Sequence, residues 1–600
     1  MAAFIAIMSG MAGLLLSRKQ IGTGKFPFIC VSGTIAKNAM ACAGCWASVA
    51  RWQWSKWTGG AKQTWFERMT GVSMGHAAPV AQPANTGPRK QHTMLAKKAG
   101  ARSFATPVNT LNQPSQGYRI RNGWVWLAAA ALLAACGGGS GTSTDRPIKP
   151  NLLPAAQLAN TCVSPASGEK QGTVNDEKAW VRSFVDERYL WYQEVPTVDA
   201  SNFATAASYF DVLKTPAKNT AGGDLDRFHW SETKEQYEQY TNGISVDYGI
   251  DWSRISNSAP RNYVVYNVEP QSAAGLAGVQ RGDKLMKVDG IDFINGTDVA
   301  GLNNGVFPQD QAAHAFEFQR GTSTLKRTLQ AGQYANTPVR GAKVINDNGT
   351  KVAYLYFDSF IAKSQDQLIA AFADFQKQGA KELILDMRYN GGGLLYISSQ
   401  LAYMVAGSSA SNGKTFNKLV YNDKRSSDNY TYNFIPYALN TNYYYDYARP
   451  LPSLNLKRVT LLVDHGTASA SEAVINGLMG IDVTVNLIGS ATYGKPYGFS
   501  PEGNCGRYYY AVEFKGENHK GFSSFDAGFA PTCAVKDDLN FQLGDLAEPR
   551  LAEALQYLKS GQCTNTPTAS IKALGTAEQS PSVVDPKRAR ALMIPTQVHP

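Results

Sequence analysis

Hydrophobic and polar positions form their clearest pattern around residues 459–478. The uninterrupted apolar run Val459–Val463 predicts a buried strand, a turn of small residues follows it, and Glu472–Leu478 has helical spacing. Ser469 therefore lies at the start of a predicted helix, where unpaired amides and the helix dipole favour negative charge. A serine there can be a nucleophile whose oxyanion is already stabilised. It can also be an ordinary N-cap, since Ser469 and Glu472 fit a capping box, and the pattern alone leaves both interpretations open.

Strand and helix patterns alternate through the whole of residues 336–563. Val352–Phe357 and Glu382–Asp386 predict buried strands, and between them a helix is expected to begin at the capping pattern Ser364–Gln367 and to stop at Gly379. This alternation predicts a single α/β domain.

Three glycines, Gly391–Gly393, follow the second of these strands and precede another predicted helix. Without a Cβ, the backbone amides of such a loop can approach a ligand closely. Phosphate binding is a weak alternative, because no Gly-Lys-Ser/Thr sequence follows the loop.

Two further regions precede the α/β domain. Residues 173–244 have helical patterns with aromatic anchors such as Trp180 and Phe184, which we interpret as core. Residues 245–335 change to strand character, for example at Tyr263–Val268. We therefore predict an α/β multidomain protein with a small N-terminal helical domain, a β-rich domain with short helices, and the α/β domain.

The β-rich region resembles a PDZ domain. The resemblance rests on Pro270–Gly278 (P-Q-S-A-A-G-L-A-G) and Gly282–Gly290 (G-D-K-L-M-K-V-D-G). It implies that polypeptide C-termini are captured as an added strand, with the carboxylate held by a loop at Tyr248, Gly249 and Ile250. The alternative is a PDZ domain that packs against its neighbour and binds nothing.

Charge is distributed very unevenly along the 600 residues. Residues 1–135 contain fifteen Lys/Arg and one acidic residue, whereas residues 136–600 contain 43 basic and 46 acidic residues. The net charge of +11 therefore belongs to the N-terminal segment, and no nucleic-acid surface is predicted for the folded body.

The end of that segment has the pattern of a secretory signal. A basic stretch at Arg119–Arg121 is followed by the apolar run Trp124–Ala135, which is too short to span a bilayer, and then by Cys136. Leu133–Cys136 resembles a bacterial lipobox, which implies lipidation of Cys136. We therefore expect an exported lipoprotein of the cell envelope, anchored to a membrane and facing the periplasm or the cell surface, and an over-long start assignment upstream of the signal. An ordinary signal with a chance cysteine is the alternative.

We predict a flexible tether over residues 136–172 and a disordered polar tail over residues 564–600. Four cysteines remain after lipidation: Cys162, Cys505, Cys533 and Cys563. In an exported protein they suggest two disulfides with three possible pairings, of which we prefer Cys505–Cys533 because it closes one local excursion. The cysteines could equally stay reduced, and their spacing resembles no zinc site.

The order of the motifs carries a second resemblance. D-x-R-x-N-G-G-G (Asp386–Gly393), G-T-A-S-A-S-E (Gly466–Glu472) and Y-G-K (Tyr493–Lys495), behind a PDZ-like region, are similar to the C-terminal processing (tail-specific) peptidases. The resemblance covers roughly residues 175–560. It implies a catalytic pair of Ser469 and Lys495, with oxyanion donors at the backbone of Ala470 and of Gly391 or Gly392. It also implies polypeptide substrates and no metal or organic cofactor.

The chemistry is consistent with this resemblance. A serine hydroxyl is a poor nucleophile until a base takes its proton. Lys495 can be that base if burial lowers its pKa, and apolar neighbours such as Tyr493, Tyr497 and Phe499 would provide a water-poor setting. One position departs from the family pattern, because Phe499 stands where the family often has a glutamine. His465, four residues before Ser469, is interpreted as structural.

The leading hypothesis is thus a lipid-anchored serine endopeptidase that binds substrate C-termini through a PDZ domain. The main alternative is a PDZ-containing lipoprotein that binds peptides and whose peptidase-like domain is weak or inactive, and a third is an envelope scaffold or surface antigen. Four further polar residues are interpreted as scaffolding or helix caps: Asp386, Arg388, Glu472 and Asp482.

Overall fold

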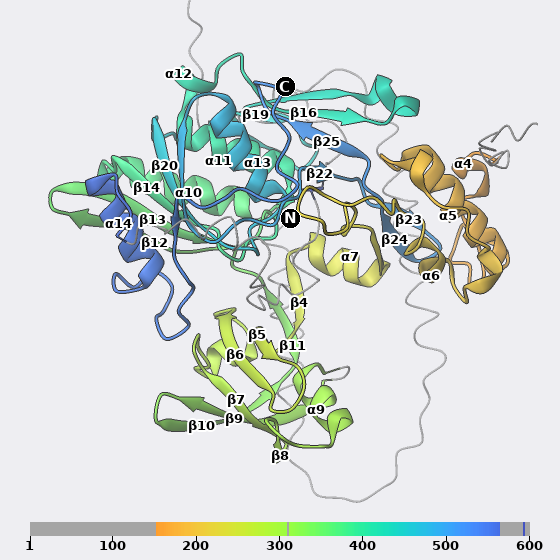
Figure 1. Ribbon diagram of the computed structural model, residues 1–600, viewed down its shortest axis with the longest axis horizontal. Coiled ribbons are helices and arrows are strands. Elements are labelled where there is room, and N and C mark those ends of the chain that lie inside the picture. Colours follow the sequence, from red (N-terminus) through yellow and green to blue (C-terminus); the bar gives the residue numbers. More distant parts are fainter. Residues whose placement is uncertain (1–151, 309–310, 565–591, 594–600) are drawn as a thin grey trace, which may run out of the picture. The chain divides into compact units, whose positions relative to one another are not determined.

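The computed structural model describes residues 152–308, 311–564 and 592–593 (Figure 1). The predicted signal, the predicted lipidation site Cys136, residues 136–151 of the predicted tether and nearly all of the tail lie outside these residues. The prediction of a flexible tether is wrong for residues 152–172, which contain α4 (Ala155–Leu158), the paired strands β1 (Thr161–Cys162) and β2 (Lys170–Gln171), and a disulfide at Cys162. Among the described helices, none has both the length and the apolarity that crossing a bilayer requires.

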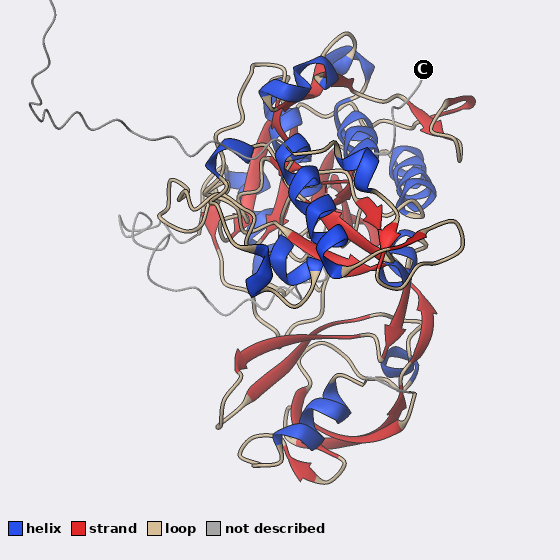
Figure 2. Cartoon of the chain, turned by 90° about the vertical axis from the view of Figure 1, so that its right-hand side faces the viewer, coloured by secondary structure: helices blue, strands red, loops and turns tan. Residues whose placement is uncertain are grey.

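The α/β domain is organised around a sheet of six strands with the order β12-β13-β14-β20-β21-β26. The β12–β13 pair is antiparallel, and every other pair is parallel. Helices lie against these strands (Figure 2). The strands are β12 (Val339–Asp347), β13 (Thr350–Phe357), β14 (Glu382–Asp386), β20 (Arg458–Val463), β21 (Thr484–Gly489) and β26 (Cys533–Ala534). The helices are α10 (Ser364–Gln378), α11 (Leu395–Ala406), α12 (Ser408–Ser411), α13 (Ala470–Gly480) and α14 (Pro549–Ser560).

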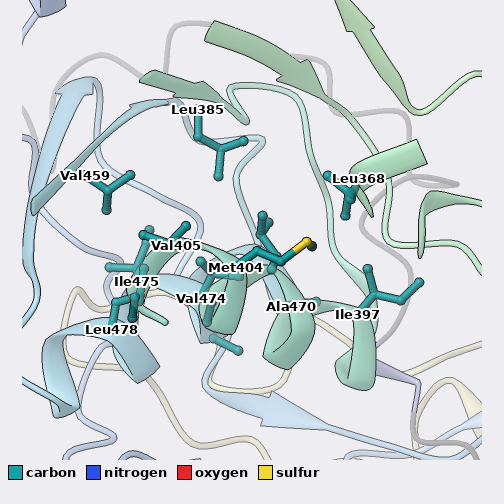
Figure 3. Packing of buried hydrophobic residues seen from close by; sticks show 14 of the residues in the cluster. Leu368, Leu385, Ile397, Met404, Val405, Val459, Ala470, Val474, Ile475 and Leu478 are labelled. Atoms are coloured by element: carbon teal, nitrogen blue, oxygen red, sulfur yellow. The ribbon is translucent and has the colours of Figure 1, made fainter. Parts of the chain in front are cut away.

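Successive side chains of a strand point to opposite faces of the sheet, and in this sheet both faces are buried. On β14, Leu383 and Leu385 join the core that contains α10, α11 and α13, whereas Ile384 joins a smaller core under α14. Continuous apolar runs are the expected pattern for strands covered on both faces. Figure 3 shows the larger core, with side chains of α11 and α13 packed towards Leu385 and Val459 of the sheet.

Most predicted boundaries in this domain are confirmed. The strand runs at 352–357, 382–386 and 459–463 lie in β13, β14 and β20, and α10 ends at Gly379 in a left-handed conformation (φ +74°). The expected capping pair is wrong. Gln367 accepts a hydrogen bond from the Val339 amide of β12 instead, so tertiary packing uses the side chain that the pattern assigned to the cap.

Smaller strands follow in two β-sheets at the edge of the domain. One sheet has the order β17-β16-β25-β22. The other is the pair β18–β19, which follows β17 in the chain. Their bounds are β16 (Thr415–Tyr421), β17 (Tyr430–Asn433), β18 (Tyr437–Leu439), β19 (Tyr445–Pro450), β22 (Tyr497–Gly498) and β25 (Phe514–Glu517). The strand β15 (Gly393–Leu394) pairs in parallel with β27 (Leu592–Met593).

The N-terminal helical region, Ala155–Thr241, shares its core with a late part of the chain. Its aromatic side chains form one cluster with Tyr497–Val512, and its strand β3 pairs with β24 of a hairpin in that segment. The main elements are α4 (Ala155–Leu158), α5 (Val174–Arg188), α6 (Ala206–Phe210), β3 (Trp230–Thr233), α7 (Lys234–Thr241), β23 (Glu502–Asn504) and β24 (Arg507–Tyr510). The predicted helices are present, and the shared sheet was not expected.

The β-rich region, Ile244–Ala335, has its own core around Trp252, Val265 and Phe316. Its main sheet has the order β10-β9-β7-β6-β5, so β5 lies at an edge. The chain enters through β4 and leaves through β11, which pair with each other. The elements are β4 (Ile244–Asp247), β5 (Ile250–Ser256), β6 (Asn262–Val268), α8 (Ala273–Leu276), β7 (Lys284–Val288), β8 (Ile291–Asp292), α9 (Val299–Val306), β9 (Ala313–Arg320), β10 (Ser323–Gln330) and β11 (Gly332–Ala335).

The predicted disulfide Cys505–Cys533 is wrong. Cys505 is bonded to Cys162, and Cys533 is bonded to Cys563. Cys505 lies in the turn of the β23–β24 hairpin, which packs on the helical region, whereas Cys533 lies on β26 close to the end of α14. The first bond joins residues 343 positions apart, so proximity in sequence was a misleading guide.

Candidate active site

Ser469 occupies a strained position in the turn between β20 and α13. Its backbone has φ 60° and ψ −113°, a combination that a non-glycine residue rarely adopts and that is concentrated at functional sites. The side chain is 1 % exposed, and its Oγ has no hydrogen-bond partner among the described residues. Ser469 and Glu472 thus have the arrangement of the predicted capping box, but the hydroxyl makes no capping hydrogen bond of normal geometry. The Glu472 carboxylate accepts a bond from the Ser469 amide (2.9 Å).

Glu472 also fixes the loop that carries Lys495. Its carboxylate accepts bonds from the Thr492 hydroxyl (2.6 Å), the Gly494 amide (2.7 Å) and the Lys495 amide (2.8 Å). Burial raises the pKa of Glu472, and these four hydrogen bonds oppose that rise by stabilising the charged form. One buried carboxylate thus holds the serine turn and the lysine loop together, which extends its predicted role as a cap.

The glycine loop packs directly against the serine turn. A Cβ on Gly392 (φ +106°) would lie 2.8 Å from the Ser469 Cβ and 2.9 Å from the Ala470 nitrogen, so only glycine fits. Asn390 locks the contact, because its carbonyl accepts bonds from the Ala468 amide (3.0 Å) and the Ser471 hydroxyl (2.9 Å).

Two backbone amides remain as oxyanion donors. The Gly392 amide donates to the Asn390 side chain (2.9 Å), so in this arrangement it is not available to a substrate. The amides of Ala470 and Gly391 donate to no acceptor within the described residues. Of the two predicted glycines, the structure therefore favours Gly391, together with Ala470 at the first turn of α13.

Lys495 lies in an aromatic, nearly dry setting. It is 2 % exposed, and its amine is 4.3 Å from the centroid of the Phe499 ring and 5.1 Å from that of Phe228. Burial lowers the pKa of Lys495 to about 7, although the nearby Asp226 carboxylate acts in the opposite direction. Phe499 stands where the family often has a glutamine. Its ring contacts the Lys495 amine as a cation–π partner, so this position offers an aromatic contact and not a hydrogen-bonding side chain.

No sequence pattern indicates that residues 226–228 reach this site. The Arg227 guanidinium donates to the Tyr493 carbonyl (2.6 Å) and the Gly494 carbonyl (3.3 Å), directly before Lys495. It also lies over the Tyr493 ring at 4.7 Å. A separation of more than 260 residues hides this contact from any local pattern. The helical region thus supplies one wall of the lysine site.

Ser469 and Lys495 line one cavity. Its remaining walls come from α13, two strands and the loops beside them: Asn417, Ala473, Asn476, Pro496, Gly516 and Phe525. A buried hydroxyl, an amine that is partly neutral near pH 7 and two free amides are the groups that acyl transfer requires.

The remaining polar residues that we interpret as structural make the following contacts. Asp386 and Arg388 form a fully buried ion pair (2.9 Å) that continues to Glu548. Asp482 pairs with Lys520 on the surface. His465 is an exposed residue whose ring contacts the Tyr493 ring at 5.0 Å, and partial desolvation lowers the pKa of its imidazole.

The predicted carboxylate-binding loop of the β-rich region is arranged as follows. The Tyr248 hydroxyl donates to the Gly305 carbonyl of α9 (3.0 Å), and the Gly249 amide donates to the Asp247 side chain. Ile250 is the first residue of the edge strand β5.

Comparisons with known proteins agree with the sequence motifs. Residues 351–501 match the model of peptidase family S41, and residues 176–231 match the model of the peptidase S41 N-terminal domain. A carboxyl-terminal-processing protease of Picosynechococcus sp. is 28 % identical over 240 residues, which cover 38 % of this chain and 49 % of that protein. This chain thus spans about half the length of that relative. The chloroplastic carboxyl-terminal-processing peptidase 1 of Arabidopsis thaliana is 25 % identical over 363 residues, 58 % of this chain and 68 % of that protein.

Solved structures show the same fold. The crystal structure of a Bacteroides fragilis protein assigned to the S41 proteases superposes with a TM-score of 0.51, at 24 % identity, over 64 % of this chain and 97 % of that one. The two segments matched by the family models contain Arg227, Ser469 and Lys495. These two segments are therefore similar to peptidase family S41 and to its N-terminal domain.

Proposed function

We propose that the protein is a serine endopeptidase that hydrolyses peptide bonds with a Ser469–Lys495 pair. The observation that carries the proposal is the buried, unpartnered Ser469 hydroxyl, which shares a cavity with an amine whose pKa lies near 7. The match to family S41 and the curated carboxyl-terminal-processing proteases support it.

The residues of the site support the following reaction. Neutral Lys495 takes the Ser469 proton as Oγ attacks the substrate carbonyl, and the amides of Ala470 and Gly391 stabilise the oxyanion. The protonated amine then gives its proton to the departing amine, which leaves an acyl ester on Ser469. Lys495 next deprotonates a water molecule that attacks this ester, and it returns that proton to Ser469 Oγ as the bond to Oγ breaks and the acid product leaves.

The low lysine pKa sets the pH dependence. Because only the neutral amine accepts a proton, kcat/KM should rise with pH through about 7. The unfolded lysine titrates near 10.5, so between pH 7 and 10.5 the unfolded state binds more protons and stability rises with pH. At pH 7 the buried amine costs the fold about 4 kcal/mol, and Lys495→Met should therefore raise Tm while abolishing activity.

Purified protein incubated with an unfolded polypeptide tests the proposal. Ser469→Ala and Lys495→Ala should each abolish cleavage, and the double variant should be little worse, because residues that act as one unit are not additive. Lys495→Arg should also fail, since a guanidinium stays protonated. Cleavage by Ser469→Ala would contradict the proposal and would favour a peptide-binding protein with an inactive domain.

We also propose that the β-rich region is a PDZ domain that presents substrate C-termini. The edge position of β5 supports this role, because an extended peptide could pair with it. Fluorescence anisotropy should detect binding of peptides with a free C-terminal carboxylate and much weaker binding of their amides. Equal binding of both forms would contradict capture of the carboxylate.

The protein is further proposed to be an exported lipoprotein, anchored through Cys136 and facing the periplasm or the cell surface. The two disulfides support an oxidising compartment. Mass spectrometry of membrane-extracted protein should find a lipidated Cys136 as the first residue. A mature chain that retains residues before 119 would contradict the proposal.

A further inference from the structure

We infer that the cavity beside Ser469 selects substrates by the residue whose carbonyl is attacked, and that Asn417 recognises a small side chain with a hydroxyl or amide group at that residue. The inference rests on the proposed peptidase function and specifies its substrate class.

The cavity starts at the nucleophile and extends along α13. Ala473 and Asn476 follow Ser469 by one and two helical turns, and all three line the cavity. The side chain next to the attacked carbonyl is the substrate group nearest to this space. Phe525 and Pro496 contribute apolar walls, and no carboxylate lines the cavity, so a large or cationic side chain finds no complement there.

In the cavity wall, the Asn417 side chain packs over a glycine on the neighbouring strand. A Cβ on Gly516 would lie 2.6 Å from the Asn417 Oδ1 and 2.8 Å from its Nδ2. The amide group therefore occupies the space that any side chain on Gly516 would fill. Asn417 lines the same cavity as Ser469, and it is only 6 % exposed.

The two asparagines of the wall differ in their hydrogen bonds. The Asn476 amide donates to the Phe522 carbonyl (3.0 Å) and accepts from the Asn518 side chain (2.9 Å). The Asn417 Oδ1 is buried without a partner, and its Nδ2 has none within the described residues. Buried amides are normally satisfied, and an unsatisfied one in a binding cavity is a recognition group for a ligand. Because an amide both donates and accepts, its complements are hydroxyl and carboxamide groups.

The test uses the full chain and a pool of peptides from a digested proteome, with mass spectrometry to locate each cleaved bond. Ser, Thr and Asn should be enriched before the cleaved bond. A synthetic pair that differs only in Thr or Val at this residue separates hydrogen bonding from shape. We expect kcat/KM for the Thr peptide to exceed that for the Val peptide by about tenfold or more.

Asn417→Leu should remove this Thr preference, so that the ratio of kcat/KM for the Thr peptide to that for the Val peptide falls to about one. Asn486→Leu is the matched control, because Asn486 is equally buried (7 % exposed) on β21 and lies outside the cavity, so the preference should persist. If Asn417→Leu does not fold, Asn417→Ala gives the same comparison. Cleavage without a Thr preference, or a preference that survives both Asn417 variants, overturns this inference alone. Failure to cleave any peptide overturns the proposed function as well.

Discussion

The helical region and the β-rich region are joined to the α/β domain in opposite ways. The helical region has no complete core of its own, since its aromatic cluster includes Tyr497, Phe499 and Tyr509 from the late segment. The β-rich region has a separate core, and it meets the α/β domain through individual contacts such as the Arg281–Asp537 ion pair (2.7 Å) and the Tyr266–Tyr389 ring contact (4.4 Å). The first is therefore part of the lysine site, and the second is a module attached to it.

Excising each region is the strongest test of this difference. Ile244 and Ala335 face each other on β4 and β11, so a short linker can replace residues 245–334 without opening the rest of the chain. That variant should fold and cleave short peptides. A chain that lacks residues 152–233 should neither fold nor cleave, because Phe499 and Tyr510 would lose their partners. Circular dichroism and peptide hydrolysis report both outcomes. If the second variant folds and cleaves peptides, the proposed difference between the two regions is wrong.

Phe228→Ala should have the next largest effect. Loss of this ring admits water to Lys495, so the pKa of the amine moves towards its ordinary value and the midpoint of the pH profile rises. At pH 7 kcat/KM should fall between about ten- and a hundredfold.

The control for Phe228→Ala is Phe293→Ala in the core of the β-rich region, where the ring is similarly buried (3 % against 5 % exposed). It should destabilise its own region without moving the pH midpoint. A midpoint unchanged in Phe228→Ala would show that the helical region does not set the lysine pKa.

The two disulfides should differ in their importance. Replacing Cys162 and Cys505 with Ser should cost about 2–5 kcal/mol and lower activity, because this bond ties the helical region to the late hairpin. Replacing Cys533 and Cys563 releases a loop of only 30 residues at the far end of α14 and should affect stability more than activity. Urea unfolding with parallel activity assays distinguishes these outcomes. Equal losses of activity would contradict the expected difference between the two bonds.

His465→Ala should have the smallest effect, below about threefold in kcat/KM, because its ring only packs on the outer side of Tyr493. If His465→Ala is inactive and Lys495→Ala is active, the general base is the histidine and not the proposed lysine.

The sequence could predict elements whose pattern lies within one short stretch of the chain. β14 and β20 appear as apolar runs, Gly379 ends its helix, and Ser469 lies where strand and helix patterns meet. Contacts between distant segments could not be predicted. Arg227, the Cys162–Cys505 bond and the Asn417 cavity wall each depend on strands or loops that meet only in the folded chain.

The shared core of the helical region also has a consequence for biosynthesis. Trp180, Phe184 and Phe210 leave the ribosome early, but Tyr497, Tyr509 and Tyr510, which cover them, are made near the end of the chain. The wall that lowers the lysine pKa therefore cannot form on an unfinished chain. If the proposed Ser469–Lys495 mechanism holds, a nascent chain therefore stays inactive until it is nearly complete.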